Sequence, residues 1–236
     1  IMAEFQLIDP IKAEKFISML KNINVLSSHI TIYFKKNEIY SQGMDPSQVC
    51  LFEFTINTVG DNKWIDYYKL ENETETNIGI NCIILAKILN TYKKDQAITF
   101  KVDSKKNDIL GIDFNFINEK ANSIYDKEFQ IPLMDINEEL LTIPNKEYAV
   151  DIEIQSKIFD KLCGEFALFD EMLKIKCSEK KIEMTASGTD GKMKVNINVD
   201  DLDEFSIEED LVYQDSFSLT YFNHMCTFHK LSDTML

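Results

Sequence analysis

Apolar residues recur at helical spacing near the start of the chain and again just past its middle. The first stripe consists of Ala13, Phe16, Ile17 and Leu20. The second consists of Ile158, Phe159, Leu162 and Phe166. Each stripe predicts an amphipathic helix that follows a strand end, within 8–23 and 148–166 respectively. A further helix is expected later in each half, at 81–92 and 216–228.

Between these helices the chain alternates apolar and polar residues, which predicts strands separated by short turns. In the first half the expected strands are 29–34, 38–45, 49–57, 97–102 and 109–116. In the second half they are 173–178, 181–188 and 192–199. The order helix, strands, helix, strands is therefore used twice. We expect an α+β fold of two similar domains, with helices on one face of antiparallel sheets.

The acidic and apolar stretch QIPLMDINEELLTIPNKEY, at 130–148, joins the two halves. We expect an N-terminal domain at 1–131, a connector at 132–147 and a C-terminal domain at 148–236. A chain of 236 residues that is 44% hydrophobic can close two cores of ordinary size. No apolar run reaches the roughly 18 residues of a membrane-spanning helix, and no signal-peptide pattern opens the chain. We expect a soluble intracellular protein without a membrane partner.

The formal net charge is −15, which by itself disfavours binding to nucleic acid. Acidic residues, however, gather in loops, whereas lysines lie on the predicted helices away from the apolar stripes. These are Lys15, Lys21, Lys87, Lys94, Lys157 and Lys161. Each could be an ordinary solvated helix residue. Their repetition in both halves favours a weakly basic surface.

The sequence gives little sign of catalysis. The five cysteines have no paired spacing, and three histidines are too few for a convincing zinc site, so we expect no metal and no cofactor. A metal-dependent enzyme could use the acidic run Asp200, Asp201, Asp203 and Glu204. No phosphate-binding glycine loop or nucleophile motif accompanies that run. We therefore expect no catalytic residues, and the enzyme remains the least favoured alternative.

Five segments together resemble the sliding clamps of the proliferating cell nuclear antigen family. They are QGMDPSQVCLFEF at 42–54, IGINCIILAKIL at 78–89, PLMDINEELLTIP at 132–144, IFDKLCGEF at 158–166 and KIEMTASG at 181–188. The resemblance covers nearly the whole chain in the right order. It implies a homotrimer closed head to tail into a pseudo-sixfold ring, with helices lining a hole through which double-stranded DNA passes. It also implies sequence-independent contact with phosphates.

By the resemblance, Lys15, Lys21, Lys87 and Lys161 face DNA, and the helix geometry adds Lys94 and Lys157. The chain departs from the family pattern at Asn90, Gly164 and Thr220, where the family usually has basic residues. We therefore expect a less basic lining in the second domain. The acidic trimer would repel free DNA, so a dedicated clamp loader is expected.

The family closes its ring by pairing strand edges of neighbouring subunits. The matching segments are 123–131 and 182–187, and the alternative is that these strands lie inside the monomer. The implied interface residues are Ile124, Phe129, Ile131, Ile182, Met184 and Ala186.

Family clamps also bind DNA polymerase and other clients in an apolar groove beneath the connector. The client supplies a short motif with a glutamine, an aliphatic residue and two aromatic residues. Residues that match this groove are Met44, Val49, Leu141, Ile143 and Pro144. Met44 could instead be an ordinary core residue, and Gln48 stands where a histidine is common.

The second half ends at 234–236, where the family continues with further strands, so we expect that the C-terminal strands are missing from this chain. Two related functions stay open: a subunit of a heterotrimeric checkpoint-type clamp and a monomeric processivity factor. The expected location is the nucleus, or a cytoplasmic replication site if the protein is viral.

Overall fold

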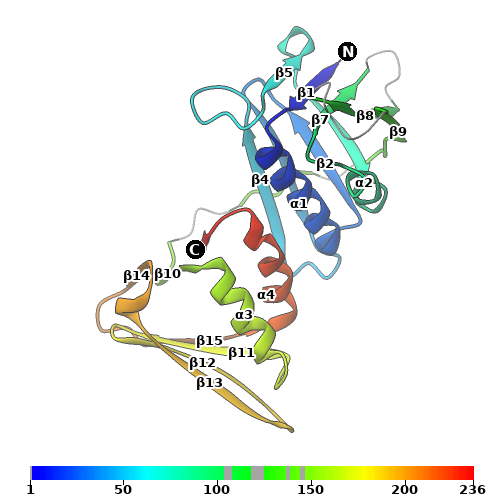
Figure 1. The fold of residues 1–236 in the computed structure, drawn as a ribbon. Coiled ribbons are helices and arrows are strands. Elements are labelled where there is room, and N and C mark those ends of the chain that lie inside the picture. Colours follow the sequence, from blue (N-terminus) through cyan, green and yellow to red (C-terminus); the bar gives the residue numbers. More distant parts are fainter. Residues whose placement is uncertain (1, 104–107, 118–124, 137–138, 144–146) are drawn as a thin grey trace. The chain divides into compact units, whose positions relative to one another are not determined.

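The computed structural model describes residues 2–103, 108–117, 125–136, 139–143 and 147–236. The chain divides into two compact units, 1–142 and 143–236 (Figure 1). Each unit runs through a strand, a helix, several strands and a second helix; three strands follow that helix in the first unit and one short strand follows it in the second. Among the described residues every strand pair is antiparallel, and the element order is used twice, so the predicted α+β class and its internal duplication are confirmed.

The first unit is built from two antiparallel sheets and two α-helices within the described residues. In chain order its elements are β1 (Ala3–Leu7), α1 (Pro10–Leu26), β2 (His29–Phe34), β3 (Glu38–Met44), β4 (Leu51–Asn57), β5 (Tyr67–Leu70), η1 (Glu71–Glu73), β6 (Thr76–Asn81), α2 (Cys82–Leu89), β7 (Gln96–Val102), β8 (Ile109–Phe116) and β9 (Lys127–Pro132). The strand orders are β5-β1-β7-β8-β9 and β4-β3-β2-β6.

Helix α1 begins where a carboxylate can accept its first free amides. Asp9 Oδ1 accepts hydrogen bonds from Ile11 N (2.8 Å) and Lys12 N (3.2 Å), and Pro10 occupies the first turn, where a missing N–H costs nothing. The predicted stripe is confirmed, because all four of its residues are buried. One of them, Phe16, packs edge-on against Phe5 with ring centroids 5.6 Å apart.

Helix α2 is shorter than the predicted 81–92. Asn81 caps its start by accepting a hydrogen bond from Ile84 N at 3.0 Å. The helix ends at Leu89, and Thr91 then closes a turn by donating its hydroxyl to Ile88 O at 2.9 Å. Residues beyond Leu89 therefore do not follow helical spacing.

The second unit repeats the plan with its own sheets and helix pair. Its elements are β10 (Val150–Gln155), α3 (Ser156–Phe166), β11 (Met172–Ser178), β12 (Lys181–Gly188), β13 (Gly191–Asn198), η2 (Val199–Asp201), β14 (Glu204–Ile207), β15 (Tyr213–Ser218), α4 (Leu219–Cys226), η3 (Thr227–Lys230) and β16 (Thr234–Met235). The strand orders are β13-β12-β11-β15 and β14-β10-β16. Helices α3 and α4 pack together, as α1 and α2 do in the first unit (Figure 1).

Two details of the second unit differ from the prediction. Ile158 is 47% exposed, and Cys163 takes a place in the core instead, because the buried side of α3 runs through Cys163 and Phe166. Helix α4 starts at Leu219 rather than at Ser216. The preceding residues are extended in β15, where Ser216 pairs with Lys174 of β11.

The connector is attached to the first unit at two places. Met134 forms an isolated β-bridge with Gly79 and donates its N–H to Gly79 O at 2.8 Å. Further along, the backbone of Leu141 is held by the side chain of Gln42. Gly79 is required here, because a Cβ at that position would collide with the Met134 carbonyl oxygen.

Candidate functional site

The lysines predicted to face DNA in the first unit are spread over the helix pair. Lys15 and Lys21 are partly exposed on α1, and Lys87 is exposed on α2, a helix without any carboxylate. Lys94 is exposed but lies in the turn after α2, so its assignment to the face of that helix is corrected. Lys94 Nζ pairs with Glu14 at 2.9 Å, and an ion pair this exposed contributes only about 0 to 1 kcal/mol.

The second unit has a sparser positive charge on its helices. Lys157 and Lys161 are exposed on α3, and Lys161 Nζ lies 3.7 Å from Glu165. Helix α4, with the sequence LTYFNHMC, contains no lysine or arginine. Gly164 and Thr220 are both exposed on these helices.

Every sheet ends in strands that are paired on one side only within the described residues, and we compared these with the predicted interface segments. In the first unit the predicted segment contains β9, an edge strand that within the described residues pairs only with β8. The rings of Phe129 on β9 and Phe114 pack edge to face, with their centroids 5.5 Å apart, and Ile131 is buried. Ile124 lies outside the described residues.

In the second unit the open edge is not where the sequence placed it. Strand β12, which contains Ile182, Met184 and Ala186, is paired on both sides, and these three side chains are buried in the core. They therefore cannot form an open edge in this structure, and that part of the prediction is corrected. The strand at the outer side of β12, with its own outer edge open within the described residues, is β13.

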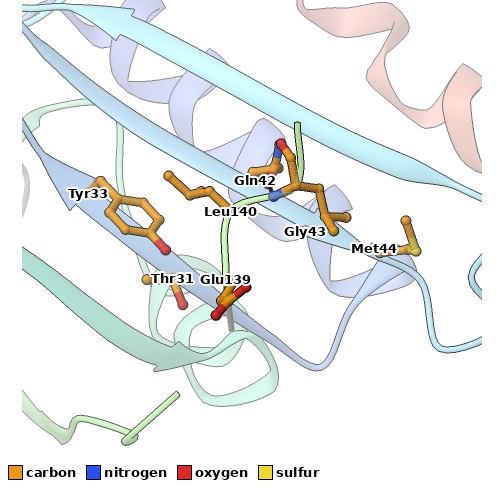
Figure 2. Close-up of a pocket in the computed structure, with 8 residues that line it drawn as sticks. Thr31, Tyr33, Gln42, Gly43, Met44, Glu139 and Leu140 are labelled. Carbon is orange, nitrogen blue, oxygen red and sulfur yellow. Dashed lines mark hydrogen bonds between the residues drawn. The ribbon is translucent and has the colours of Figure 1, made fainter. Parts of the chain in front are cut away.

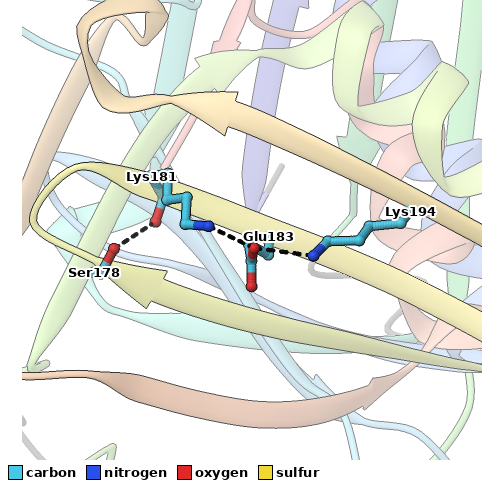
Figure 3. A network of polar contacts seen from close by, with 4 residues as sticks. All are labelled: Ser178, Lys181, Glu183 and Lys194. Carbon is cyan, nitrogen blue, oxygen red and sulfur yellow. Dashed lines mark hydrogen bonds and ion pairs between the residues drawn. The ribbon is translucent and has the colours of Figure 1, made fainter.

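A polar network fixes the β12–β13 pair on the sheet face away from the core. Lys181 Nζ and Lys194 Nζ lie 2.7 Å and 3.0 Å from Glu183 Oε1 (Figure 3). Hydrogen bonds from Lys181 and then Lys194 lower the pKa of Glu183 to about 2. The edge strand thus contributes a cation that is anchored to its neighbour.

A cavity of about 310 Å³ lies between the connector and the β2–β3 sheet (Figure 2). Met44 and Leu141, two of the predicted groove residues, both line it. The remaining lining residues are Thr31, Tyr33, Gln42, Gly43, Glu139 and Leu140. The structure therefore brings part of the predicted groove together.

Gln42 fixes the position of the connector segment that covers this cavity. Its amide donates to Leu141 O at 2.8 Å and accepts from Leu141 N at 2.7 Å, so one side chain satisfies both backbone groups of the connector residue. Gln42 is only 8% exposed. The sequence pattern singles out neither Gln42 nor the neighbouring Thr31 and Tyr33, because their burial depends on the return of the connector over the sheet.

The other predicted groove residues do not line this cavity. Val49 is 69% exposed in the β3–β4 turn, where Asp45 Oδ1 accepts hydrogen bonds from Val49 N at 2.8 Å and Cys50 N at 2.6 Å. Ile143 is exposed and belongs to the second unit. Pro144 lies outside the described residues.

The acidic run offered for metal chemistry is dispersed on the surface. Asp200 and Asp201 lie in η2, Asp203 lies in the bend that follows, and Glu204 begins β14; all four are exposed. Among the described residues, no three histidine, cysteine or acidic side chains converge as metal ligands do. In the same part of the chain, none of the helices has the length and apolarity needed to cross a bilayer.

A duplicated α+β unit, with a helix pair and antiparallel sheets in each copy, is the architecture of a DNA sliding clamp. Residues 5–140 match the N-terminal domain of proliferating cell nuclear antigen, and residues 142–236 match its C-terminal domain. The chain belongs to the proliferating cell nuclear antigen family. It is similar to proliferating cell nuclear antigen 2 of Drosophila melanogaster, with 25% identity over 232 residues that cover 98% of this chain and 86% of that relative.

Proposed function

We propose that three copies of this chain close into a ring that encircles duplex DNA and tethers a DNA polymerase and other replication and repair proteins. The observation that carries the proposal is the twofold repeat of a helix pair bearing exposed lysines, such as Lys87 and Lys157, on a chain with a net charge of −15. In this role the protein acts without catalysis, at sites of DNA replication. That site is the nucleus, or a cytoplasmic one for a viral protein.

The charge distribution supports sliding rather than tight binding. Lysines that face the hole act on phosphates at short range, while acidic residues beyond the Debye length of about 8 Å are largely screened. The six proposed DNA-facing residues remain Lys15, Lys21, Lys87, Lys94, Lys157 and Lys161. Because such contacts carry no sequence information, the ring would hold DNA mainly by topology.

The open edges of β9 and β13 support head-to-tail closure. An unpaired strand edge presents free N–H and C=O groups that template pairing with another chain. We assign the subunit contact to β9 of one copy and β13 of the next, with Phe129 and Ile131 on the first side. This replaces β12 as the contributing strand. Since a closed ring has no end for DNA to enter, a loader must open it.

The cavity beneath the connector supports client docking. Met44 and Leu141 are accessible apolar residues beside a hollow, and the flexible, polarizable side chain of methionine suits a surface that accepts varied partners. The proposed groove includes Val49 and Ile143 as exposed apolar neighbours in sequence, and Pro144 at the end of the connector. The client supplies the short glutamine, aliphatic and aromatic motif.

Light scattering combined with a primer-extension assay tests this function. We expect a solution mass of about three chains and an increase in product length when polymerase, loader and clamp act together on a long circular template. A mass of one chain that still supports processive synthesis would favour the monomeric factor. Assembly only with two other clamp-like chains would favour the heterotrimer, and failure to extend processivity in any assembly would refute the proposal.

A further inference from the structure

The four-stranded sheet of the second unit has one face covered by helices and one face open to solvent. Helices α3 and α4 pack on the covered face, where Leu173, Ile175 and Ile182 belong to the core (Figure 1). Residues that alternate with these point to the opposite face, because successive side chains of a strand point to opposite sides of the sheet. Most of the described residues there are exposed. We call this surface of β11, β12, β13 and β15 the outer sheet face.

The outer sheet face is basic in a protein whose net charge is −15. Its charged residues on the strands are Glu183 and five lysines, so positive charges exceed negative ones by four. The nearby Glu179 and Asp190 lie in the turns at the strand ends, and Glu179 Oε1 accepts a hydrogen bond from Asp210 N at 3.0 Å. All five lysines are exposed: Lys174, Lys176, Lys181, Lys192 and Lys194.

Protection of a sheet edge does not explain all of these lysines. Lysines on an edge strand discourage unwanted strand pairing, and Lys192 and Lys194 on β13 can have this role. Lys174 and Lys176, however, lie on β11, which pairs with β12 on one side and with β15 on the other. Lysine is also depleted in strands generally. Its concentration on an inner strand therefore calls for another explanation.

The register places two of the lysines on either side of one hydroxyl group. Thr185 of β12 is directly opposite Lys174 on β11 and Lys194 on β13. Neighbouring strands are about 4.8 Å apart, so both ammonium groups can reach an anion held above Thr185. Lys194 Nζ also lies 3.0 Å from Glu183 (Figure 3), but an ammonium group has three donors and so keeps donors for a ligand. Within the described residues, Lys174 has no ion-pair partner.

We propose that the outer sheet face binds an acidic segment of a partner protein, with one carboxylate seated over Thr185 between Lys174 and Lys194. Alternate side chains of an extended peptide are about 6.6 Å apart on one face. Lys174 and Lys176 are alternate residues of β11 and share this spacing, as do the two lysines of β13. A segment with an acidic residue at every second position therefore matches both pairs.

Nucleic acid fits the outer sheet face less well. The outward residues of its four strands include no aromatic side chain on which bases could stack. None of them is an arginine, the residue that forms bidentate contacts with phosphate. A rigid duplex would touch the sheet along one line, whereas a flexible acidic segment can follow its surface. The face thus favours the carboxylates of a polypeptide.

Peptide binding to the whole chain tests the proposal without any need for ring closure or DNA. The probes are a fluorescent peptide of alternating glutamate and serine, its glutamine and serine analogue, and a single-stranded oligonucleotide of equal charge. Anisotropy is measured for the unaltered protein, Thr185→Val, and Lys174→Gln combined with Lys176→Gln. The control combines Lys63→Gln with Lys69→Gln, which removes the same charge from exposed lysines of the first unit.

We expect saturable binding of the glutamate peptide and none of its glutamine analogue. The β11 double variant should bind about tenfold more weakly, as the loss of two exposed ion pairs allows. Thr185→Val should bind about threefold more weakly through the loss of one hydrogen bond, and the control should bind normally. Absence of saturable binding, or an equal loss in the control, would overturn the proposal, and so would undiminished binding by the β11 variant.

A nucleic-acid role for the face is a separate outcome of the same measurements. Tighter binding of the oligonucleotide than of the peptide, lost in the β11 double variant, would overturn the proposal in favour of that role. Thermal melting shows whether the variants fold. An NMR titration of the unaltered protein makes the test independent of them, because the methyl resonance of Thr185 should shift as the glutamate peptide binds. Saturable binding without that shift would place the peptide elsewhere and overturn the proposal.

Discussion

At the scale of single residues, Thr31 and Gln42 show how one sheet face can hold two polar groups in different states. They are directly opposite in the β2–β3 register, and both are buried. Gln42 makes two hydrogen bonds to the backbone of Leu141, whereas the Thr31 hydroxyl is unpaired within the described residues. Gln42 therefore fixes the connector over the cavity, and Thr31 leaves a hydroxyl there without a hydrogen-bond partner among the described residues.

Replacing Gln42 with methionine tests its role as a positioning residue. Gln42→Met keeps the length of the side chain but removes both hydrogen bonds to Leu141, so the connector loses its attachment at that residue. We expect amide exchange at Leu141 to become faster and client-peptide affinity to fall by roughly fivefold to thirtyfold, as one or two hydrogen bonds of about 1 kcal/mol imply. Hydrogen-exchange measurements and peptide titration report the two effects.

The matched control is Gln6→Met, which removes one hydrogen bond to Thr99 Oγ1 (3.2 Å) in the other sheet of the same unit. It should leave both Leu141 exchange and peptide affinity unchanged. If Gln42→Met leaves Leu141 protected, Gln42 does not hold the connector.

Glu183 gives a pH prediction with a defined sign. Its pKa is about 2 in the folded protein, below the ordinary value of 4.5, mainly because Lys181 and then Lys194 donate hydrogen bonds to it. A depressed carboxylate pKa stabilises the fold above the ordinary value, and this stabilisation is lost as the pH falls toward 2. An NMR titration should show a midpoint near 2. Lys181→Ala should raise that midpoint more than Lys194→Ala does, and an unshifted midpoint in both variants would contradict the network.

At the scale of elements, the sequence determines some boundaries locally and leaves others to tertiary pairing. The predicted bounds of β2 match the observed ones, because alternation and flanking turns are local signals. Strands β12 and β13 alternate equally well, so the sequence alone could not tell which one lies at the edge. Likewise Ser216 reads as helical, but pairing with Lys174 keeps it extended. The cavity needed the connector to return over the sheet, which no local pattern reports.

Two glycines of the second unit predict opposite effects of the same substitution. Gly164 lies on α3 with open space around its added Cβ, so Gly164→Ala should stabilise folding by about 0.5 to 1 kcal/mol through helix propensity. Gly188→Ala should destabilise it, because the new Cβ would collide with the Phe169 carbonyl oxygen. Urea unfolding measures both, and a destabilising Gly164→Ala would refute the open environment of α3.

At the scale of the whole molecule, an acidic chain is proposed to hold an acidic polymer. Helix α2 contains a lysine and no carboxylate, while the acidic run 200–204 lies on η2 and β14. Segregation of this kind allows a protein with a net charge of −15 to contact phosphates weakly. Topological closure then supplies the persistence that the contacts lack.

Paired lysine substitutions separate phosphate binding from ring closure. Lys157→Ala with Lys161→Ala should weaken binding to linear duplex equally across sequences, and should reduce the slope of log affinity against log salt by about 0.9 for each phosphate that is no longer neutralised. The control removes Lys174 and Lys176, which alternate with the buried Leu173 and Ile175 on β11 and so lie on the opposite sheet face. It should leave the slope unchanged. Retention on closed circular DNA should be similar for both variants, and equal slopes for the two pairs would refute the assignment of α3 to the DNA side.

The open edges β9 and β13 differ in sequence and belong to different units of the chain. A ring joined through them has no twofold axis in its plane, so its two rims are chemically distinct. Every copy then presents its connector cavity in the same sense along the duplex. A bound polymerase would therefore have one orientation along the duplex. The binding sites of the remaining copies would stay free for other enzymes.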